Sequence, residues 1–272
     1  MFYKICMFFV FITILFLFKN YFHKKEESNF YKQKEINGFI VNYYTNDNMI
    51  GKTIENGNLW GYENINKYKK YYKPNTDILD VGGFIGTNSL VLSKVIDRGN
   101  HIHVFEPQYY DCLIKNIKDN KLNHVIKPYK YGLSNIVGNI PSNNIDLNEK
   151  GNYGGKHLTT LHDKQLETIL VPKSKKTIEL KRLDDFNFSN IGLIKIDVEG
   201  FELLVLEGSI ETIKNNNYPP IFIEIWEADD WKGKPDTKDY YIKNKNDIKK
   251  YLFDLDYKII HRYGYDYIFI HQ

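Results

Sequence analysis

The chain has 272 residues, of which 42% are apolar, and this is enough for one large α/β domain with a substantial core and an appendage. Its 37 basic and 34 acidic side chains leave a net charge of +3, and the lysines are spread along the chain, so we expect no nucleic-acid partner. The two cysteines, Cys6 and Cys112, fall in an apolar leader and in a predicted helix, which excludes a disulfide framework within the domain.

An apolar run near the N-terminus indicates a membrane anchor. It extends from Ile5 to Phe18 and is interrupted by Thr13 alone. At about 1.5 Å per residue, a helix over residues 2–18 would span roughly 25 Å, and flanking lysines can extend its reach toward a bilayer core of about 30 Å. No small residues of a signal-peptidase site follow, and the positive flank after the run favours a cytoplasmic catalytic domain. We therefore expect residues 1–25 to form an uncleaved single-pass anchor, with a signal peptide or a buried helix as alternatives.

Residues 26–73 are predicted to form a linker and an N-terminal cap region. The polar stretch 26–34 is typical of a linker, residues 38–44 predict a short strand, and a helix is expected before Pro74. The main domain is then predicted to occupy residues 74–272.

A glycine-rich turn follows the first strand predicted in the main domain. The segment I-L-D-V-G-G-F-I-G (78–86) predicts a buried strand, a tight turn and the start of a helix over 87–96. Gly82, Gly83 and Gly86 permit such a turn and let backbone amides come close to a ligand. We therefore expect these three glycines to border a bound cofactor.

The next predicted strand, over 103–107, ends in an acid. Glu106 lies about 20 residues past the last glycine, where a carboxylate can accept hydrogen bonds from both ribose hydroxyls of a nucleoside cofactor. Strand, turn, helix, strand and terminal acid together predict a nucleoside-binding βαβ unit and hence an enzyme. A cofactor-free α/β domain with a glycine turn is the alternative.

Two residues around the turn indicate which nucleoside is bound. Phe84 stands where a dinucleotide-binding turn would have a glycine, and its bulk obstructs close approach to a pyrophosphate. Asp80, just ahead of the turn, would repel a pyrophosphate but attract the cationic end of a cofactor that carries an amino acid and a sulfonium. The sequence therefore favours S-adenosylmethionine over NAD.

The remaining predicted elements alternate between helix and strand. We expect helices over 109–120, 201–214 and 245–253, strands over 125–131, 193–200 and 221–226, a β-hairpin or lid over 134–177, and a C-terminal hairpin over 257–270. This alternation predicts a mostly parallel, twisted, Rossmann-like sheet, to which the C-terminal hairpin adds one antiparallel strand.

Several acids fall at or near the predicted carboxyl ends of the strands, where the ligands of such sheets collect. They are Asp80, Glu106, Asp197, Glu199 and Glu224. Asp197 and Glu199 are two residues apart, so they share a face if the strand continues that far, and capping of the next helix is their alternative role. His157, in a glycine-rich loop, is a candidate general base. No spacing of His and Asp is characteristic of a metal site, and we expect none.

These segments resemble the FkbM family of S-adenosylmethionine-dependent methyltransferases. The matching segments are I-L-D-V-G-G-F-I-G (78–86), V-F-E-P (104–107), L-D-D-F (183–186) and, most specifically, I-K-I-D-V-E-G-F-E (194–202). The resemblance extends from about Trp60 to the C-terminus.

The resemblance implies a class I methyltransferase fold and O-methylation of a hydroxyl on a sugar, a glycan or a small natural product. The matched positions that would border the methionine part of the cofactor are Asp80, Gly82 and Gly86. Glu106 would contact the ribose, and Asp197 and Glu199 would lie beside the methyl group or the acceptor. The alternatives are an NAD-dependent sugar-modifying oxidoreductase and a catalytically inactive, membrane-anchored adaptor; the oligomeric state is not indicated.

Overall fold

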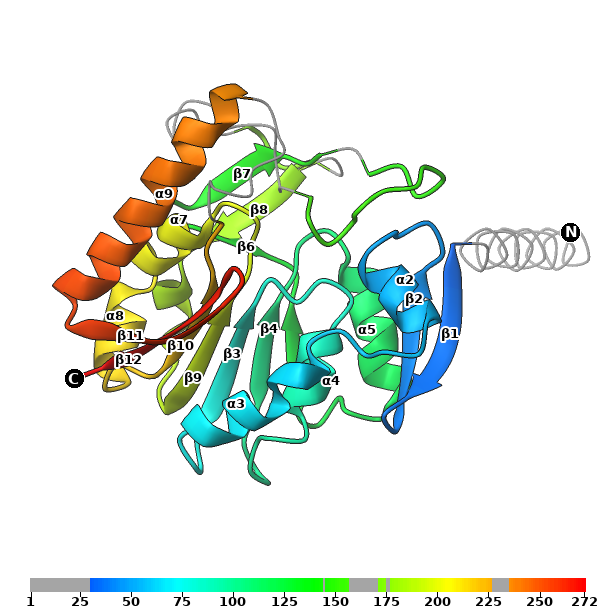
Figure 1. Ribbon diagram of the computed structural model, residues 1–272, viewed down its shortest axis with the longest axis horizontal. Coiled ribbons are helices and arrows are strands. Elements are labelled where there is room, and N and C mark those ends of the chain that lie inside the picture. The colour runs from blue at the N-terminus through cyan, green and yellow to red at the C-terminus, as the bar shows by residue number, and fades with distance from the viewer. Residues whose placement is uncertain (1–29, 144, 157–170, 175–176, 227–234) are drawn as a thin grey trace, which may run out of the picture.

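The computed structural model describes residues 30–143, 145–156, 171–174, 177–226 and 235–272, and a seven-stranded sheet forms its centre (Figure 1). From one edge to the other the strands are β11 (Tyr257–Tyr263), β12 (Asp266–His271), β10 (Ile221–Glu224), β9 (Ile191–Ile196), β3 (Asp77–Val81), β4 (Ile102–Phe105) and β5 (Ile126–Tyr129). The neighbours from β10 to β5 pair in parallel, and β12 runs antiparallel to both of its neighbours. The predicted mostly parallel sheet with a C-terminal antiparallel strand is confirmed.

Apolar cores cover both faces of this sheet, as expected for parallel strands that are continuously apolar. Along β3, Ile78 packs into one core, whereas Leu79 and Val81 pack into the other. The helices that contribute to the first core are α2 (Ile50–Glu55), α3 (Ile65–Tyr71), α4 (Thr87–Leu92) and α5 (Tyr110–Asp119). Those that contribute to the second are α7 (Glu202–Glu207), α8 (Ile210–Asn215) and α9 (Pro235–Asp254) (Figure 1).

The strand register places the carboxyl ends of β3, β4 and β9 beside one another. Val81, the last residue of β3, pairs with Phe105 on one side and with Ile196 on the other. The next residue of each strand therefore leaves the sheet at the same edge, and these residues are Gly82, Glu106 and Asp197.

The prediction of a linker over 26–34 is wrong for its last residues, because β1 (Tyr31–Ile36) forms a hairpin with β2 (Phe39–Tyr44). The hairpin is tied to α5 by the buried side chain of Asn116. The Asn116 amide accepts hydrogen bonds from the backbone N–H and the side chain of Asn42, and it donates to the carbonyls of Asn42 and Ile85. Because all these groups are buried and satisfied by one another, the hairpin is an integral part of the domain.

Shorter elements complete the described chain. They are the 3-10 turns η1 (Tyr62–Asn64) and η2 (Leu183–Phe186), and a small sheet of β6 (Gly132–Leu133), β8 (Thr177–Lys181) and β7 (Gly138–Pro141) in that order. Of the β-hairpin or lid expected over 134–177, the described residues show β7, which pairs antiparallel with β8 at the end of that range.

Several predicted elements have different bounds in the structure, and the predicted helix over 245–253 is part of α9, which begins at Pro235. The predicted helix over 201–214 is two short helices, α7 and α8, with Gly208 between them, where the backbone of Ser134 approaches so closely that a Cβ would lie 2.1 Å from its carbonyl oxygen. The predicted strand over 193–200 ends at Ile196, and the predicted helix over 87–96 ends at Leu92. Tertiary contacts set these bounds, and they cannot be predicted from the local apolar periodicity of the sequence.

The anchor predicted over residues 1–25 lies outside the described residues. Within the part of the chain that the structure describes, no helix has the length and apolar character needed to cross a bilayer.

Candidate active site

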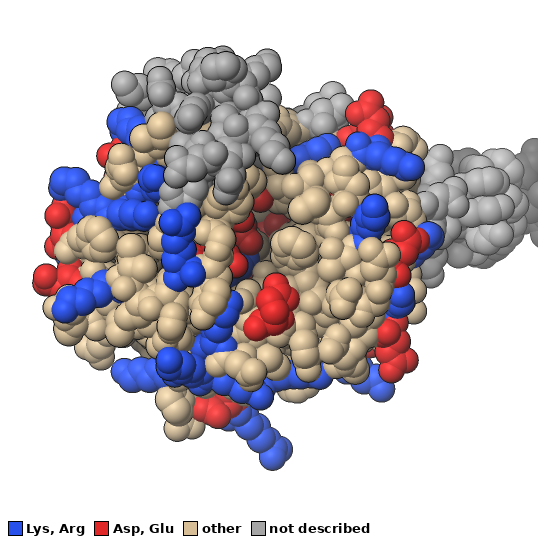
Figure 2. Space-filling model, in the orientation of Figure 1, with Lys and Arg blue, Asp and Glu red and all other residues tan. Residues whose placement is uncertain are grey.

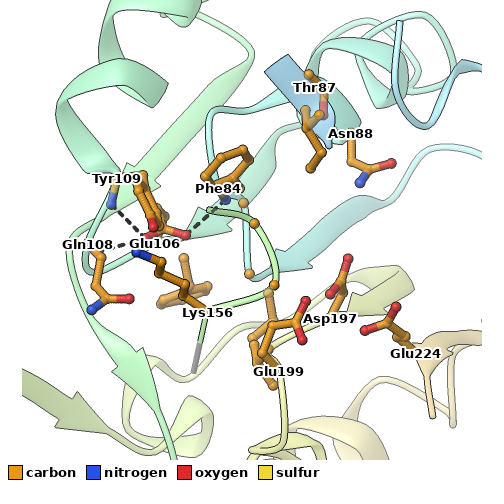
Figure 3. Close-up of a pocket in the computed structure, with 18 of the residues that line it drawn as sticks. Phe84, Thr87, Asn88, Glu106, Gln108, Tyr109, Lys156, Asp197, Glu199 and Glu224 are labelled. Carbon is orange, nitrogen blue, oxygen red and sulfur yellow. Dashed lines mark hydrogen bonds between the residues drawn. The ribbon is translucent and has the colours of Figure 1, made fainter. Parts of the chain in front are cut away.

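A cavity of about 390 Å³ opens at the carboxyl ends of the central strands (Figure 3). Its size falls within the range of small-molecule and cofactor sites, and its position at the strand ends is the usual one in open α/β sheets. The space-filling view shows acidic side chains within a hollow on this face (Figure 2). Five carboxylates line the cavity: Glu106, Asp197, Glu199, Glu224 and Asp266.

The glycine turn forms one wall because it passes directly against the end of β9. Gly82 has a φ of +84°, and a Cβ there would lie 1.7 Å from the carbonyl oxygen of Asp197. Gly82 and Gly83 line the cavity. Gly86 turns instead toward α5, where a Cβ would lie 2.7 Å from Leu113 Cδ1. Of the three predicted glycines, two border the cavity and the third permits close helix packing.

Glu106 lies on the cavity wall and is fixed there by three backbone N–H groups. Phe84 donates to Oε2 at 2.9 Å, and Gln108 and Tyr109 donate to Oε1 at 2.7 and 2.9 Å (Figure 3). Burial raises the pKa of the Glu106 carboxyl, and the three donors oppose that effect because they favour the ionised form. A carboxylate has about four acceptor sites, so this one keeps acceptor capacity toward the cavity.

The bulk of Phe84 forms part of the cavity wall. Its backbone adopts a φ of +48°, and its ring meets the Tyr109 ring edge-on at 4.6 Å between centroids. Both residues line the cavity, next to Glu106. Phe84, whose bulk indicates that the turn does not bind a pyrophosphate, thus gives the cavity an aromatic wall.

Asp80 lies behind the turn and does not line the cavity. Its carboxylate is fully buried, accepts a hydrogen bond from the Ser89 hydroxyl at 2.6 Å, and lies 3.2 Å from Lys195 Nζ. The Lys195 ammonium also donates to the carbonyl of Gly82 at 2.8 Å and lies 3.5 Å from Asp197 Oδ2. Sequence reasoning missed Lys195, although a lysine within an otherwise apolar buried strand is a usable signal.

Asp197, Glu199 and Glu224 converge, each offering an oxygen within 4.8 Å of the others (Figure 3). The predicted reason for their proximity is wrong, because β9 ends before Asp197 and Glu199 has a φ of +54°. The turn, and not an extended strand, aims the Glu199 carboxylate at the others. Among the described residues, this is the group with the spacing that a divalent cation would need, whereas the sequence predicted no metal site.

Burial and mutual repulsion perturb the same carboxyls. Burial, followed by the charges of Asp197 and Glu202, raises the pKa of Glu199 well above its ordinary value. Burial, followed by the charges of Asp197 and Glu199, does the same for Glu224. Trp226 Nε1–H donates to Glu224 Oε2 at 3.1 Å. Raised carboxyl pKa values in a cavity are typical of sites that exchange protons.

Glu202 holds the turn that carries Glu199. Its carboxylate accepts hydrogen bonds from the N–H groups of Val198 and Gly200, and burial raises its pKa to about 7. Glu202 is buried outside the cavity and fixes the loop from behind.

His157 lies outside the described residues, so its predicted role stays a prediction. Sequence reasoning also gave no role to several residues that line the cavity: Trp60, Gln108, Tyr109, Lys156, Trp226, Tyr265 and Asp266. Their loops and the C-terminal hairpin come to this edge only through tertiary packing, and no local spacing marks them.

The sheet order, the glycine turn and the cavity define an α/β protein of the methyltransferase class. A family model described as the methyltransferase FkbM domain matches residues 80–267, which is more than half of the chain. The chain therefore belongs to the FkbM methyltransferase domain family. This confirms the predicted class, an S-adenosylmethionine-dependent methyltransferase, and removes the NAD-dependent oxidoreductase as an alternative.

Individual relatives are more distant. The chain is 29% identical over 180 residues to methyltransferase sdnD of Sordaria araneosa, covering 56% of this chain and 67% of that protein. It is similar to the solved methyltransferase FkbM of Methylobacillus flagellatus KT, with 16% identity, a TM-score of 0.47 and 76% of this chain covered, but it spans only 50% of that protein's length. The O-methyltransferase TomG of Streptomyces achromogenes, solved in complex with SAM, gives 10% identity, a TM-score of 0.42 and coverage of 78% and 79% of the two chains.

The contact between the glycine turn and β9 can be tested by comparing two glycines. We expect Gly82→Ala to destabilise the fold more than Gly99→Ala, because a Cβ at 82 would lie 1.7 Å from Asp197 O, whereas nothing lies within 4 Å of one at 99. Both positions have positive φ, so backbone strain costs each about 1–3 kcal/mol and only Gly82→Ala adds an overlap. Urea unfolding measures both losses. Equal losses would mean that the turn does not touch the strand end.

Proposed function

We propose that this chain is an S-adenosylmethionine-dependent O-methyltransferase that acts on a hydroxyl of a sugar, a glycan or a small natural product. The observation that carries the proposal is one cavity that has Glu106 at one side, Phe84 of the glycine turn in the middle, and the three converging carboxylates at the other side (Figure 3). A nucleoside cofactor and an acceptor can therefore meet in a single enclosure.

The residues of this chain suit a cationic cofactor. S-adenosylmethionine supplies a methyl group that is activated by a positively charged sulfur. Glu106 keeps acceptor capacity for ribose hydroxyls, Phe84 and Tyr109 offer aromatic surface beside it, and the carboxylates beyond the turn favour positive charge electrostatically. No arginine lines the cavity among the described residues, so this lining lacks the bidentate guanidinium donors that often clamp a pyrophosphate.

S-adenosylmethionine, bound with its ribose at Glu106, would supply the methyl group to the acceptor oxygen, and its sulfur would leave as a neutral thioether. The hydroxyl proton passes to the Glu199 carboxylate, whose raised pKa makes it a better proton acceptor than an ordinary carboxylate. Asp197 is held beside it by Lys195 and helps to position the acceptor. Alignment of the three reacting atoms can supply roughly 7–11 kcal/mol, which exceeds the roughly 3–5 kcal/mol that a general base typically supplies.

The far wall offers a surface for a ring. Trp226 and Tyr265 stack at 4.9 Å between centroids with an interplanar angle of 21°, and both line the cavity near Glu224. An aromatic face beside carboxylate acceptors is suited to a sugar or another hydroxylated ring, since it covers the apolar side of the ring while the hydroxyls donate to the acids.

Cofactor binding provides the first test. We expect Glu106→Ala to weaken S-adenosylmethionine binding by about 1.5–3 kcal/mol, the scale of hydrogen bonds to a charged group. Isothermal titration of the unaltered chain and the variant measures this loss, with thermal unfolding to confirm that the variant is folded. Unchanged affinity in a folded variant would contradict the ribose assignment, and no binding by the unaltered chain would contradict the proposed function.

The role of Glu199 can be tested once an acceptor is in hand. Mass spectrometry of glycans and lipids from cells with and without the protein should show a product heavier by one methylene. With that acceptor, we expect Glu199→Gln to lower kcat by about 10²–10⁴-fold. The base must be ionised, so activity of the unaltered chain should fall as the pH drops through the raised pKa of Glu199, and the variant should lack this acid limb.

The exposed Glu211→Gln change on α8 serves as a control that should leave the rate unchanged. If Glu199→Gln, like Glu211→Gln, kept the rate and pH profile of the unaltered chain, another group would be the base. Cofactor binding without turnover on any acceptor would favour the inactive adaptor.

We also propose that residues 1–25 anchor the chain to a membrane, with the catalytic domain on the cytoplasmic side, on the strength of the apolar run and its basic flank. Deletion of these residues removes nothing that the structure describes, because the described chain begins at Phe30. We expect the full chain to sediment with membranes and the truncated chain to remain in the supernatant. Sedimentation of the truncated chain would contradict the anchor.

A further inference from the structure

Two segments that lie far apart in the sequence meet in one wall of the cavity. Met49 and Ile50 come from the start of α2, and residues 152 and 154–156 come from a loop after β7. We call these residues the cap wall. The two segments touch, because a Cβ at Gly154 would lie 2.9 Å from Ile50 Cδ1. The first segment precedes residues 80–267, which the family model matches, so part of the cap wall lies outside the matched domain.

The carboxylate of Asp47 joins the two segments. Asp47 is only 3% exposed. Its Oδ1 accepts hydrogen bonds from the N–H groups of Met49 at 3.1 Å and Tyr153 at 3.4 Å, and its Oδ2 accepts one from the N–H of Gly51 at 2.9 Å. Burial of a carboxylate is costly unless donors satisfy it, and here the donors belong to both segments. One side chain therefore sets the distance between them.

Backbone hydrogen bonds beside this carboxylate hold the same segments together. The Asn48 N–H donates to the Gly151 carbonyl at 2.9 Å, and the Gly151 N–H donates to the Asn46 carbonyl at 3.1 Å. Asp47 and Gly151 form an isolated parallel bridge. Gly51 permits the close approach of α2, since a Cβ there would lie 2.9 Å from Asp47 Cβ. The side chain and the backbone together fix one arrangement of the two segments.

The cap wall contacts the groups that hold Glu106. A Cβ at Gly154 would lie 3.7 Å from the Phe84 ring, and the Phe84 N–H donates to Glu106 Oε2. The Tyr109 hydroxyl donates to the Tyr153 carbonyl at 2.9 Å, and the Tyr109 N–H donates to Glu106 Oε1. A displacement of the loop would therefore reach Glu106 through Phe84 and Tyr109.

We propose that Asp47 is a positioning residue of the cofactor site, which holds the cap wall against Phe84 and Tyr109 and so keeps Glu106 directed into the cavity. This inference rests on the proposed function and adds to it a residue outside the matched domain. Asp47 does not itself line the cavity, so it acts through the wall and not by touching a ligand. A site keeps its geometry when the residues behind it are locked by packing and hydrogen bonds.

Binding of S-adenosylhomocysteine to the full chain tests this role. Isothermal titration is made at a temperature at which thermal unfolding shows each variant to be folded. We expect Asp47→Ala to weaken binding about tenfold or more, because a misplacement of about 1 Å in a site can cost about a hundredfold. An Asn oxygen in the place of Oδ1 would still accept from Met49 and Tyr153, so Asp47→Asn should recover most of this loss.

Amide hydrogen exchange reports on the cap wall directly and without a ligand. We expect Asp47→Ala to speed exchange over residues 49–51 and 151–156 and to leave exchange in α8 unchanged. If the alanine variant did not fold, Asp47→Ser would take its place in both measurements. Its shorter side chain can still accept from the start of α2 but is too short to keep the bond to Tyr153.

Asp184→Ala is the matched control. The Asp184 carboxylate also accepts two backbone N–H groups, those of Glu211 at 3.2 Å and Thr212 at 2.7 Å in the first turn of α8, and it does not line the cavity. Its removal should lower the Tm and speed exchange in α8. It should leave the affinity for S-adenosylhomocysteine within about twofold, because distant sites act independently.

Three results would overturn the inference. A folded Asp47→Ala variant could bind S-adenosylhomocysteine as tightly as the unaltered chain, it could lose no more affinity than Asp184→Ala, or its exchange could rise throughout the chain and not at the cap wall. Absence of binding by the unaltered chain is a different result: it would contradict the proposed function and this inference with it, while the exchange measurement would still show whether Asp47 holds the two segments together.

Discussion

The ammonium of Lys195 is the interaction on which the site depends. It lies at the centre of a sheet, in a strand whose every residue is buried, and it contacts Asp80, the carbonyl of Gly82 and Asp197. A buried charge is costly to desolvate, and a well-packed apolar residue at such a position is often no less stable. Its contacts offer a reason for its presence, because the ammonium joins β3, the glycine turn and the end of β9 at one point.

The same cation sets the electrostatics of the cavity. Burial raises the pKa values of Glu106, Glu199 and Asp266, and the charge of Lys195 opposes that rise in all three. One cation thus acts on several of the carboxylates that line the cavity, and where these are ionised they outnumber the cations of the described lining. A cofactor that carries positive charge is favoured by that field, and an anionic acceptor would be opposed by it.

The sequence predicted the frame of the molecule better than the contents of its site. The strand, glycine turn and acid of residues 78–106 were predictable because local apolar pattern and glycine conformation determine them. Asp197 and Glu199 were placed at the correct edge for an incorrect reason, since a left-handed backbone at Glu199, and not a continued strand, brings the carboxylates together. Asp266 could not be placed, because only the packing of the C-terminal hairpin against the sheet brings it to the cavity.

The buried carboxyl of Glu202 makes the stability of the domain depend on pH. Its pKa is about 7 in the folded chain and 4.5 at its ordinary value, so the group is protonated in the fold and ionised in the unfolded chain between those limits. Folding therefore takes up a proton in that window, and the free energy of unfolding declines as the pH rises through it, by up to about 1.4 kcal/mol per pH unit for one such group. The pKa values of Glu199 and Glu224 are raised in the same way. The carboxyls that form the site therefore also lower the free energy of unfolding as the pH rises.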